Sequence, residues 1–140
     1  MKFFTWILKL LLLLNTLFEL GVALVMIAAP VVIIPQLHQT GEAIEPLLRS
    51  LTRLIGFGTL AIAVLSGLMV TRNLSPEVKF AGFGALAVFH LGMTASQVLN
   101  NIDGLSSIPV VIIHGVFALV FLALFLWHMG QKTPAPTPAA

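Results

Sequence analysis

Long runs of hydrophobic residues, separated by short polar stretches, dominate the chain. Four of these runs reach the length of about 20 mostly apolar residues that a helix needs to cross a hydrocarbon core roughly 30 Å thick. They predict membrane-spanning helices over residues 10–29, 51–70, 80–99 and 108–127. Pro30 indicates that the first of these helices ends near residue 29. We therefore expect an all-α, polytopic integral membrane protein folded as a four-transmembrane-helix bundle.

The polar stretches between the runs predict where the helices begin and end. Ser75-Pro76-Glu77 offers a capping hydroxyl, a proline at the first helical position and an acid in the first turn, so a helix is expected to begin there. Gly130 is expected to end the last helix. Residues 36–50 predict a loop with a short amphipathic turn. We expect one transmembrane domain over residues 1–132 and a flexible, Pro/Ala-rich tail over 133–140.

Composition supports lipid as the solvent of this fold. Hydrophobic residues make up 59% of the 140 residues and charged residues only 9%, whereas soluble domains average about a quarter charged. The few Lys and Arg residues form no basic stripe interleaved with aromatic residues, so nucleic acid is not expected as a partner. The chain has no cysteine, which excludes disulfides, thiolate nucleophiles and thiolate metal sites.

The distribution of Lys and Arg predicts the orientation. One side of the membrane would hold five of them, and the other side only Arg49 and Arg53. Because cytoplasmic loops carry the excess of positive charge, both termini are expected in the cytoplasm, as in a multi-pass protein of the bacterial inner membrane. The five inner residues are Lys2, Lys9, Arg72, Lys79 and Lys132.

Ionisable residues inside the predicted spans are the candidate functional residues, since each one costs a few kcal/mol in hydrocarbon. Glu19 lies near the middle of the first span and His90 at the centre of the third, within roughly 5 Å of each other in depth. His114, in the fourth span, lies about one turn further out, near the depth of Thr94. We expect these four side chains to form an inward-facing polar cluster.

Two interpretations of this cluster stay open. Buried polar groups can hold membrane helices together, at about 0.5–2 kcal/mol each. Alternatively, Glu19 and His90 form a titratable pair. The third span also carries Gln97 and Asn101 at helical spacing after His90, which predicts a polar stripe on one face. The opposite face, with Phe80, Val88 and Leu99, is expected to meet lipid.

No cofactor and no metal site is the simplest expectation, and the chain contains no sequence motif of a catalytic site. A haem between His90 and His114 is one alternative, and a chlorin whose magnesium binds one of these histidines is another. Neighbouring helices about 8–10 Å apart leave little room for a porphyrin. The remaining histidines, His38 and His128, are expected to face water.

Short segments in the first half of the chain resemble small bacterial four-helix membrane proteins of the DoxX-like kind. These segments are Leu20-Gly21 followed by Pro30, and Arg53-Leu54-Ile55-Gly56 at the start of the second span. The resemblance implies a four-helix fold that is sometimes found as a subunit beside respiratory or quinone-linked enzymes. It implies no catalytic residue.

Three functions follow as expectations. The first is a non-catalytic accessory or structural subunit that docks onto a larger membrane complex (respiratory, quinone-linked or photosynthetic), with lipid and other membrane subunits as partners. The second is a proton-coupled transporter of small molecules that uses Glu19 and His90. The third is an electron-transfer subunit that binds haem or a chlorin through His90 and His114.

Overall fold

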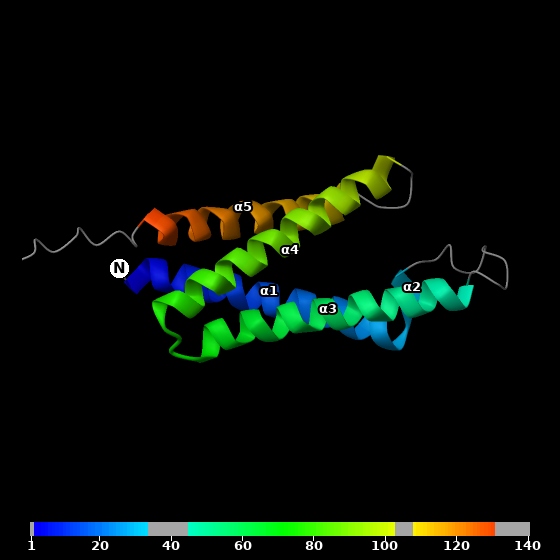
Figure 1. The fold of residues 1–140 in the computed structure, drawn as a ribbon, viewed down its shortest axis with the longest axis horizontal. Coiled ribbons are helices and arrows are strands. Elements are labelled where there is room, and N and C mark those ends of the chain that lie inside the picture. The colour runs from blue at the N-terminus through cyan, green and yellow to red at the C-terminus, as the bar shows by residue number, and fades with distance from the viewer. Residues whose placement is uncertain (1, 34–44, 103–107, 131–140) are drawn as a thin grey trace, which may run out of the picture. The chain divides into compact units, whose positions relative to one another are not determined.

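The computed structural model describes residues 2–33, 45–102 and 108–130, and these residues are almost entirely helical (Figure 1). Four helices are long and apolar enough to cross a membrane, which confirms the all-α class and indicates a multi-pass membrane protein. Glu42, Asp103, Lys132 and the predicted tail at 133–140 lie outside the described residues. The helices are α1 (Lys2–Ala28), α2 (Pro30–Ile33), α3 (Glu45–Thr71), α4 (Pro76–Ile102) and α5 (Ile108–Gly130).

The helices begin and end at their capping residues, as the sequence predicts in most places. α4 begins at Pro76, and the Val78 N–H donates to Ser75 Oγ at 3.4 Å. α5 ends at Gly130, and α1 ends two residues before Pro30. The loop predicted for residues 36–50 is wrong over residues 45–50, because α3 already begins at Glu45. Pro46 there occupies the first turn, where its missing N–H costs no hydrogen bond.

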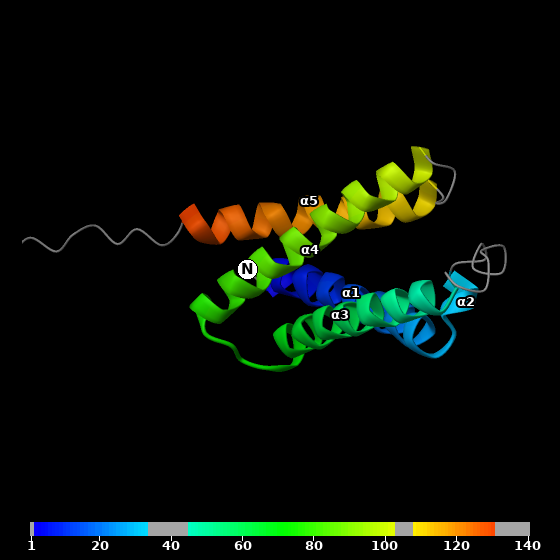
Figure 2. The same ribbon diagram turned by 45° about the vertical axis from the view of Figure 1, so that its right-hand side comes forward.

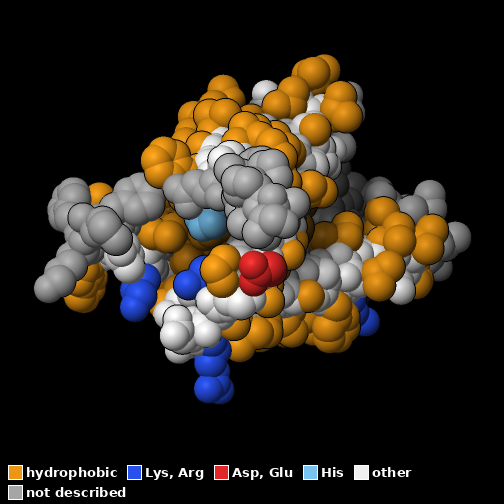
Figure 3. Space-filling model, turned by 60° about the vertical axis from the view of Figure 1, so that its left-hand side comes forward, with side chains coloured by type: hydrophobic (Ala, Val, Ile, Leu, Met, Phe, Trp, Pro, Cys, Tyr) orange, Lys and Arg blue, Asp and Glu red, His pale blue; other side chains and the backbone are white. Residues whose placement is uncertain are grey.

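Two compact units, Met1–Asn73 and Leu74–Ala140, make up the chain. In the first unit α1 packs against α3, and in the second α4 packs against α5 (Figure 2). The single domain expected over residues 1–132 stays a prediction, and each unit is described by itself. Hydrophobic side chains cover most of the face in Figure 3, with a few Lys and Arg side chains between them.

The first unit is held by a narrow seam of small and polar residues. Buried positions recur at steps of three and four along α1 and α3, as in antiparallel helices that interlock their side chains. Ser66 Oγ donates across the seam to the Leu12 carbonyl at 2.9 Å. On α1 the buried residues are Leu12, Asn15, Glu19, Ala23 and Met26, and on α3 Thr52, Gly56, Thr59, Ala63, Ser66 and Met69.

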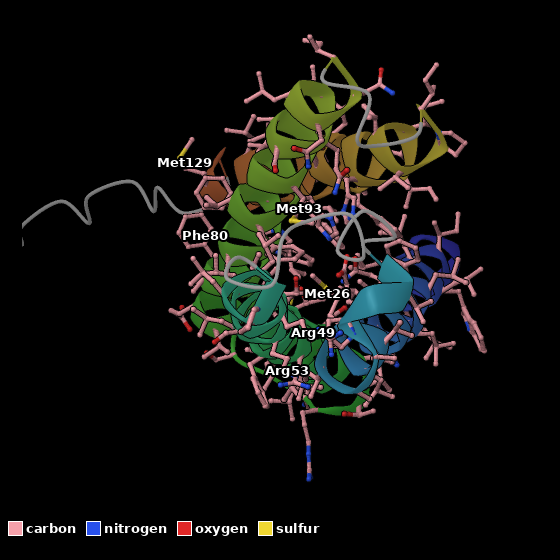
Figure 4. All side chains as sticks on the ribbon, turned by 90° about the vertical axis from the view of Figure 1, so that its right-hand side faces the viewer. Met26, Arg49, Arg53, Phe80, Met93 and Met129 are labelled. Carbon is pink, nitrogen blue, oxygen red and sulfur yellow. The ribbon has the colours of Figure 1, made fainter. Side chains whose placement is uncertain are left out.

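Arg53 and Gly56 bind the end of α1 to the start of α3 (Figure 4 labels Arg53 and Met26). Arg53 Nε donates to the Ile27 carbonyl at 3.3 Å, in the last turn of α1, where carbonyls lack helical partners. A Cβ on Gly56 would lie 2.9 Å from both Met26 Cβ and Ile27 Cγ1, so only glycine allows this approach. These contacts give the Arg53-Leu54-Ile55-Gly56 segment a structural role.

The second unit is held mainly by aromatic rings. Phe80 stacks on Phe125 with ring centroids 4.7 Å apart, and a Cβ on Gly84 would lie 3.0 Å from Phe125 Cε2. The Phe125 ring thus lies against α4 where a side chain is missing. The prediction that Phe80 faces lipid is wrong, because an aromatic partner lies on the facing helix. Val88 and Leu99, at 72% and 62% exposure, point outward as expected.

Candidate functional site

A buried pair of histidines lies in the second unit, where the middle of α4 meets the first half of α5. His90 and His114 are 0% and 3% exposed, and their Nδ1 atoms lie 3.2 Å apart. A neutral imidazole has one nitrogen that donates and one that accepts. One of the two facing Nδ1 atoms therefore carries a hydrogen and donates it to the lone pair of the other.

Three phenylalanines enclose the ring of His90. Phe117 and Phe121 of α5 stack on it, with centroid distances of 5.2 and 5.5 Å and interplanar angles of 30° and 25°. Phe89 meets the same ring edge-on, at 5.2 Å and 82°. His114, Phe117 and Phe121 follow one another at steps of three and four, so one face of α5 supplies both the hydrogen-bond partner and the stacking rings. The packing orients the His90 ring towards His114.

Thr94 lies beside the histidine pair, and its hydroxyl is bonded within its own helix. Its Oγ1 donates to the backbone carbonyl of His90 at 2.7 Å, so the hydroxyl hydrogen is used within α4. Its Cγ2 lies 3.8 Å from the position that a Cβ on Gly115 would take. Thr94 therefore packs α4 against α5 beside the histidine pair.

Glu19 lies in the first unit and is fully buried on the seam of α1. Asn15 and Ala23, one turn to either side, are buried on the same face of this helix. The predicted pairing of Glu19 with His90 would join residues of separate units. It stays a prediction, as does the four-residue cluster as a whole.

His128 differs from its expected position in water. Its side chain is half-buried, and Nδ1–H donates to the Leu124 carbonyl at 2.9 Å. The ring also packs on Phe83, with centroids 5.1 Å apart. His128 is thus a packing residue of α5 near the end of that helix. His38 lies outside the described residues.

The geometry of the pair bears on which groups it could hold. Two axial haem ligands approach the iron from opposite faces of the porphyrin, whereas these Nδ1 atoms face each other at hydrogen-bond distance. A haem between His90 and His114 does not fit this arrangement. The separation would suit two nitrogens on one tetrahedral ion, with Zn–N distances of about 2.0–2.1 Å. The two histidines would supply only two of the four ligands that a tetrahedral ion takes.

The residues that sequence reasoning missed are the rings around His90. Phe117 and Phe121 were indistinguishable from lipid-facing residues of an apolar span, and only their helical spacing from His114 could have singled them out. Comparison with models of known protein families finds no match, and neither curated proteins nor solved structures match the chain. The resemblance to DoxX-like proteins therefore stays a prediction, and function rests on the chemistry of the site.

Proposed function

We propose that this chain is a proton-coupled transporter of small molecules in the bacterial inner membrane, in which His90 and His114 pass the coupling proton. The distance of 3.2 Å between their buried Nδ1 atoms carries the proposal. Imidazole changes its charge nearer to neutral pH than any other side chain, and ionisable groups at membrane depth commonly form proton pathways. An amide would suffice to hold two helices together without that property.

The pair passes a proton through its four ring nitrogens. A proton binds Nε2 of the ring whose Nδ1–H donates. That ring then gives its Nδ1 hydrogen to the facing Nδ1, and the second ring releases the hydrogen on its own Nε2. One proton has entered and one has left. Afterwards the second ring is the donor, so the pair alternates between two hydrogen-bonded states.

This alternation suits a transport cycle. Each passage leaves the hydrogen bond reversed, and the next passage in the same direction requires both rings to turn over or a proton to return. A protein that alternates between two accessible states supplies such a reset. Phe117 and Phe121 stack on the His90 ring and hold it against His114 during the passage.

The test uses inverted membrane vesicles in which respiration builds a proton gradient, read by a quenched acridine dye. A panel of organic cations, anions and neutral solutes is added, and a transported compound discharges the gradient. We expect His90→Gln and His114→Gln to abolish the discharge and His128→Gln, a matched change on the same helix as His114, to retain it. Discharge unchanged in His90→Gln would refute the proposal. Loss in Glu19→Gln as well would extend the proton path to this carboxylate.

The orientation belongs to the same proposal and has its own test. The five-to-two distribution of Lys and Arg supports cytoplasmic termini. Reporter fusions after Arg72 and after Lys132 should both report cytoplasm, and a fusion near Glu42 should report the outside. A cytoplasmic signal at Glu42 would contradict the orientation.

A second candidate function is the accessory subunit of a larger membrane complex. Its support is the open surface beside three glycines on spanning helices, since a Cβ on Gly21, Gly58 or Gly92 would meet nothing within 4 Å. Such positions let another helix approach closely. Purification from native membranes in mild detergent should then yield stoichiometric partner subunits. The absorption spectrum of the same sample tests for a chlorin bound to one of the two histidines, the third candidate.

A further inference from the structure

An apolar groove beside one exposed cation lies in the first unit, at the end of the helix pair where α1 begins and α3 ends. Its volume is about 460 Å³. Five of its six lining residues are apolar, and the sixth is the exposed Lys9. The lining consists of Trp6, Ile7, Lys9, Leu10 and Leu13 of α1 and Val70 of α3.

We propose that this groove binds one phospholipid with an anionic headgroup, its acyl chain in the groove and its phosphate at Lys9. The lining repeats the pattern of such a lipid, since a single charge adjoins an apolar strip. Trp6 and Leu13 are seven residues apart on α1, which corresponds to roughly 10 Å of helix. This covers most of the hydrocarbon of one leaflet, about half of a core roughly 30 Å thick.

Trp6 and Lys9 have the chemistry of a membrane interface. The Trp6 side chain is 75% exposed, and tryptophan rings concentrate at the level of the lipid headgroups. Lys9 contributes its aliphatic stem to the lining, and the side chain is exposed, so its ammonium is open to a counter-charge beside the groove. An anionic lipid brings that counter-charge with it. Charge complementarity therefore favours the lipid as occupant.

The groove contains its own reporter, because Trp6 and Trp127 are the only tryptophans of the chain. The Trp127→Phe protein is reconstituted in phosphatidylcholine bilayers. One sample contains a small fraction of brominated phosphatidylglycerol and the other the same fraction of brominated phosphatidylcholine. The quenching of Trp6 fluorescence by bromine is compared between the two samples. Attraction of one Lys for anionic lipid predicts about fivefold preferential quenching by the phosphatidylglycerol. Lys9→Gln should remove the preference. Leu10→Phe places a larger side chain in the groove without adding a second tryptophan. It should weaken the quenching of Trp6 by both lipids.

Arg72→Gln is the matched control. Arg72 is an exposed cation in the same unit, two residues beyond Val70, and does not line the groove. The preference should survive this change. Equal loss in Lys9→Gln and Arg72→Gln would overturn the site in favour of diffuse surface attraction, and equal quenching by the two lipids before any substitution would overturn it outright. Inorganic phosphate at millimolar concentration should not compete, and competition would mean that the cation binds phosphate without the acyl chain.

Discussion

The two units pair their helices by different means. In the first, the contacts between helices are fixed in one state: Ser66 Oγ and Arg53 Nε donate to backbone carbonyls, and Gly56 brings the backbones close together. In the second, aromatic rings fill the interface, and its polar contact joins two imidazoles that can exchange donor and acceptor roles. A polar contact in a membrane protein is therefore a candidate for function when it has two states of similar chemistry.

The largest expected effect breaks the first unit at Gly56. A Cβ there would lie 2.9 Å from Met26 Cβ, an atom attached directly to the backbone of α1. Gly56→Ala should therefore lower the free energy of unfolding in detergent by about 1–3 kcal/mol. Gly58→Ala is the control on the same helix, where the added methyl group meets nothing within 4 Å. Thermal unfolding measures both, and equal losses would contradict the close approach.

The second prediction sharpens the role of the histidine contact. In a double-mutant cycle of His90→Gln and His114→Gln, the two losses should be non-additive by about 1–2 kcal/mol, because one shared hydrogen bond is removed by either change. Strictly additive losses would show that the two rings do not interact. The control is a second cycle of His90→Gln and His128→Gln. Because His128 Nδ1–H donates within α5, the two losses of stability in this cycle should be additive.

The smallest prediction concerns the hydroxyl contact of the first unit. Ser66→Ala removes the hydrogen bond to the Leu12 carbonyl and should cost about 0.6–1.7 kcal/mol of stability in detergent or bilayers. Thr71→Val is its control, since Thr71 Oγ1 donates within α3, to the Gly67 carbonyl at 2.9 Å, and is exposed. Neither change should affect transport. A transport defect in Ser66→Ala would end the contrast between the two units.

Hydropathy was sufficient to predict the helical class and the four span-length helices, because chain segments in hydrocarbon must satisfy their backbone hydrogen bonds internally. Hydropathy misplaced the start of α3, because it detects only the apolar part of a helix. The helix itself extends beyond that part, to a residue such as Pro46 that is well suited to its first turn. Which helices pair could not be derived, because most faces of these helices are equally apolar.

The candidate site was predicted in part. Counting residues along the spans put His114 about one turn further out than His90, in one inward-facing cluster. The structure brings their Nδ1 atoms to 3.2 Å, a contact that depth alone did not predict. Rotation about the helix axis is not fixed by depth, which is why Phe80 was assigned to the wrong face. The hydrogen bond of Thr94 was not predicted, although a threonine in a helix readily donates to the carbonyl four residues earlier.

The most direct test of the shared hydrogen is ¹⁵N NMR of protein labelled at histidine in bilayers, after treatment with a metal chelator. Of the four histidines, His38 and His128 are replaced by Gln, so that His90 and His114 give the only ring signals. We expect one protonated and one bare Nδ1, with a coupling between them across the hydrogen bond. Two bare Nδ1 atoms without coupling, in rings that titrate independently of each other, would contradict it.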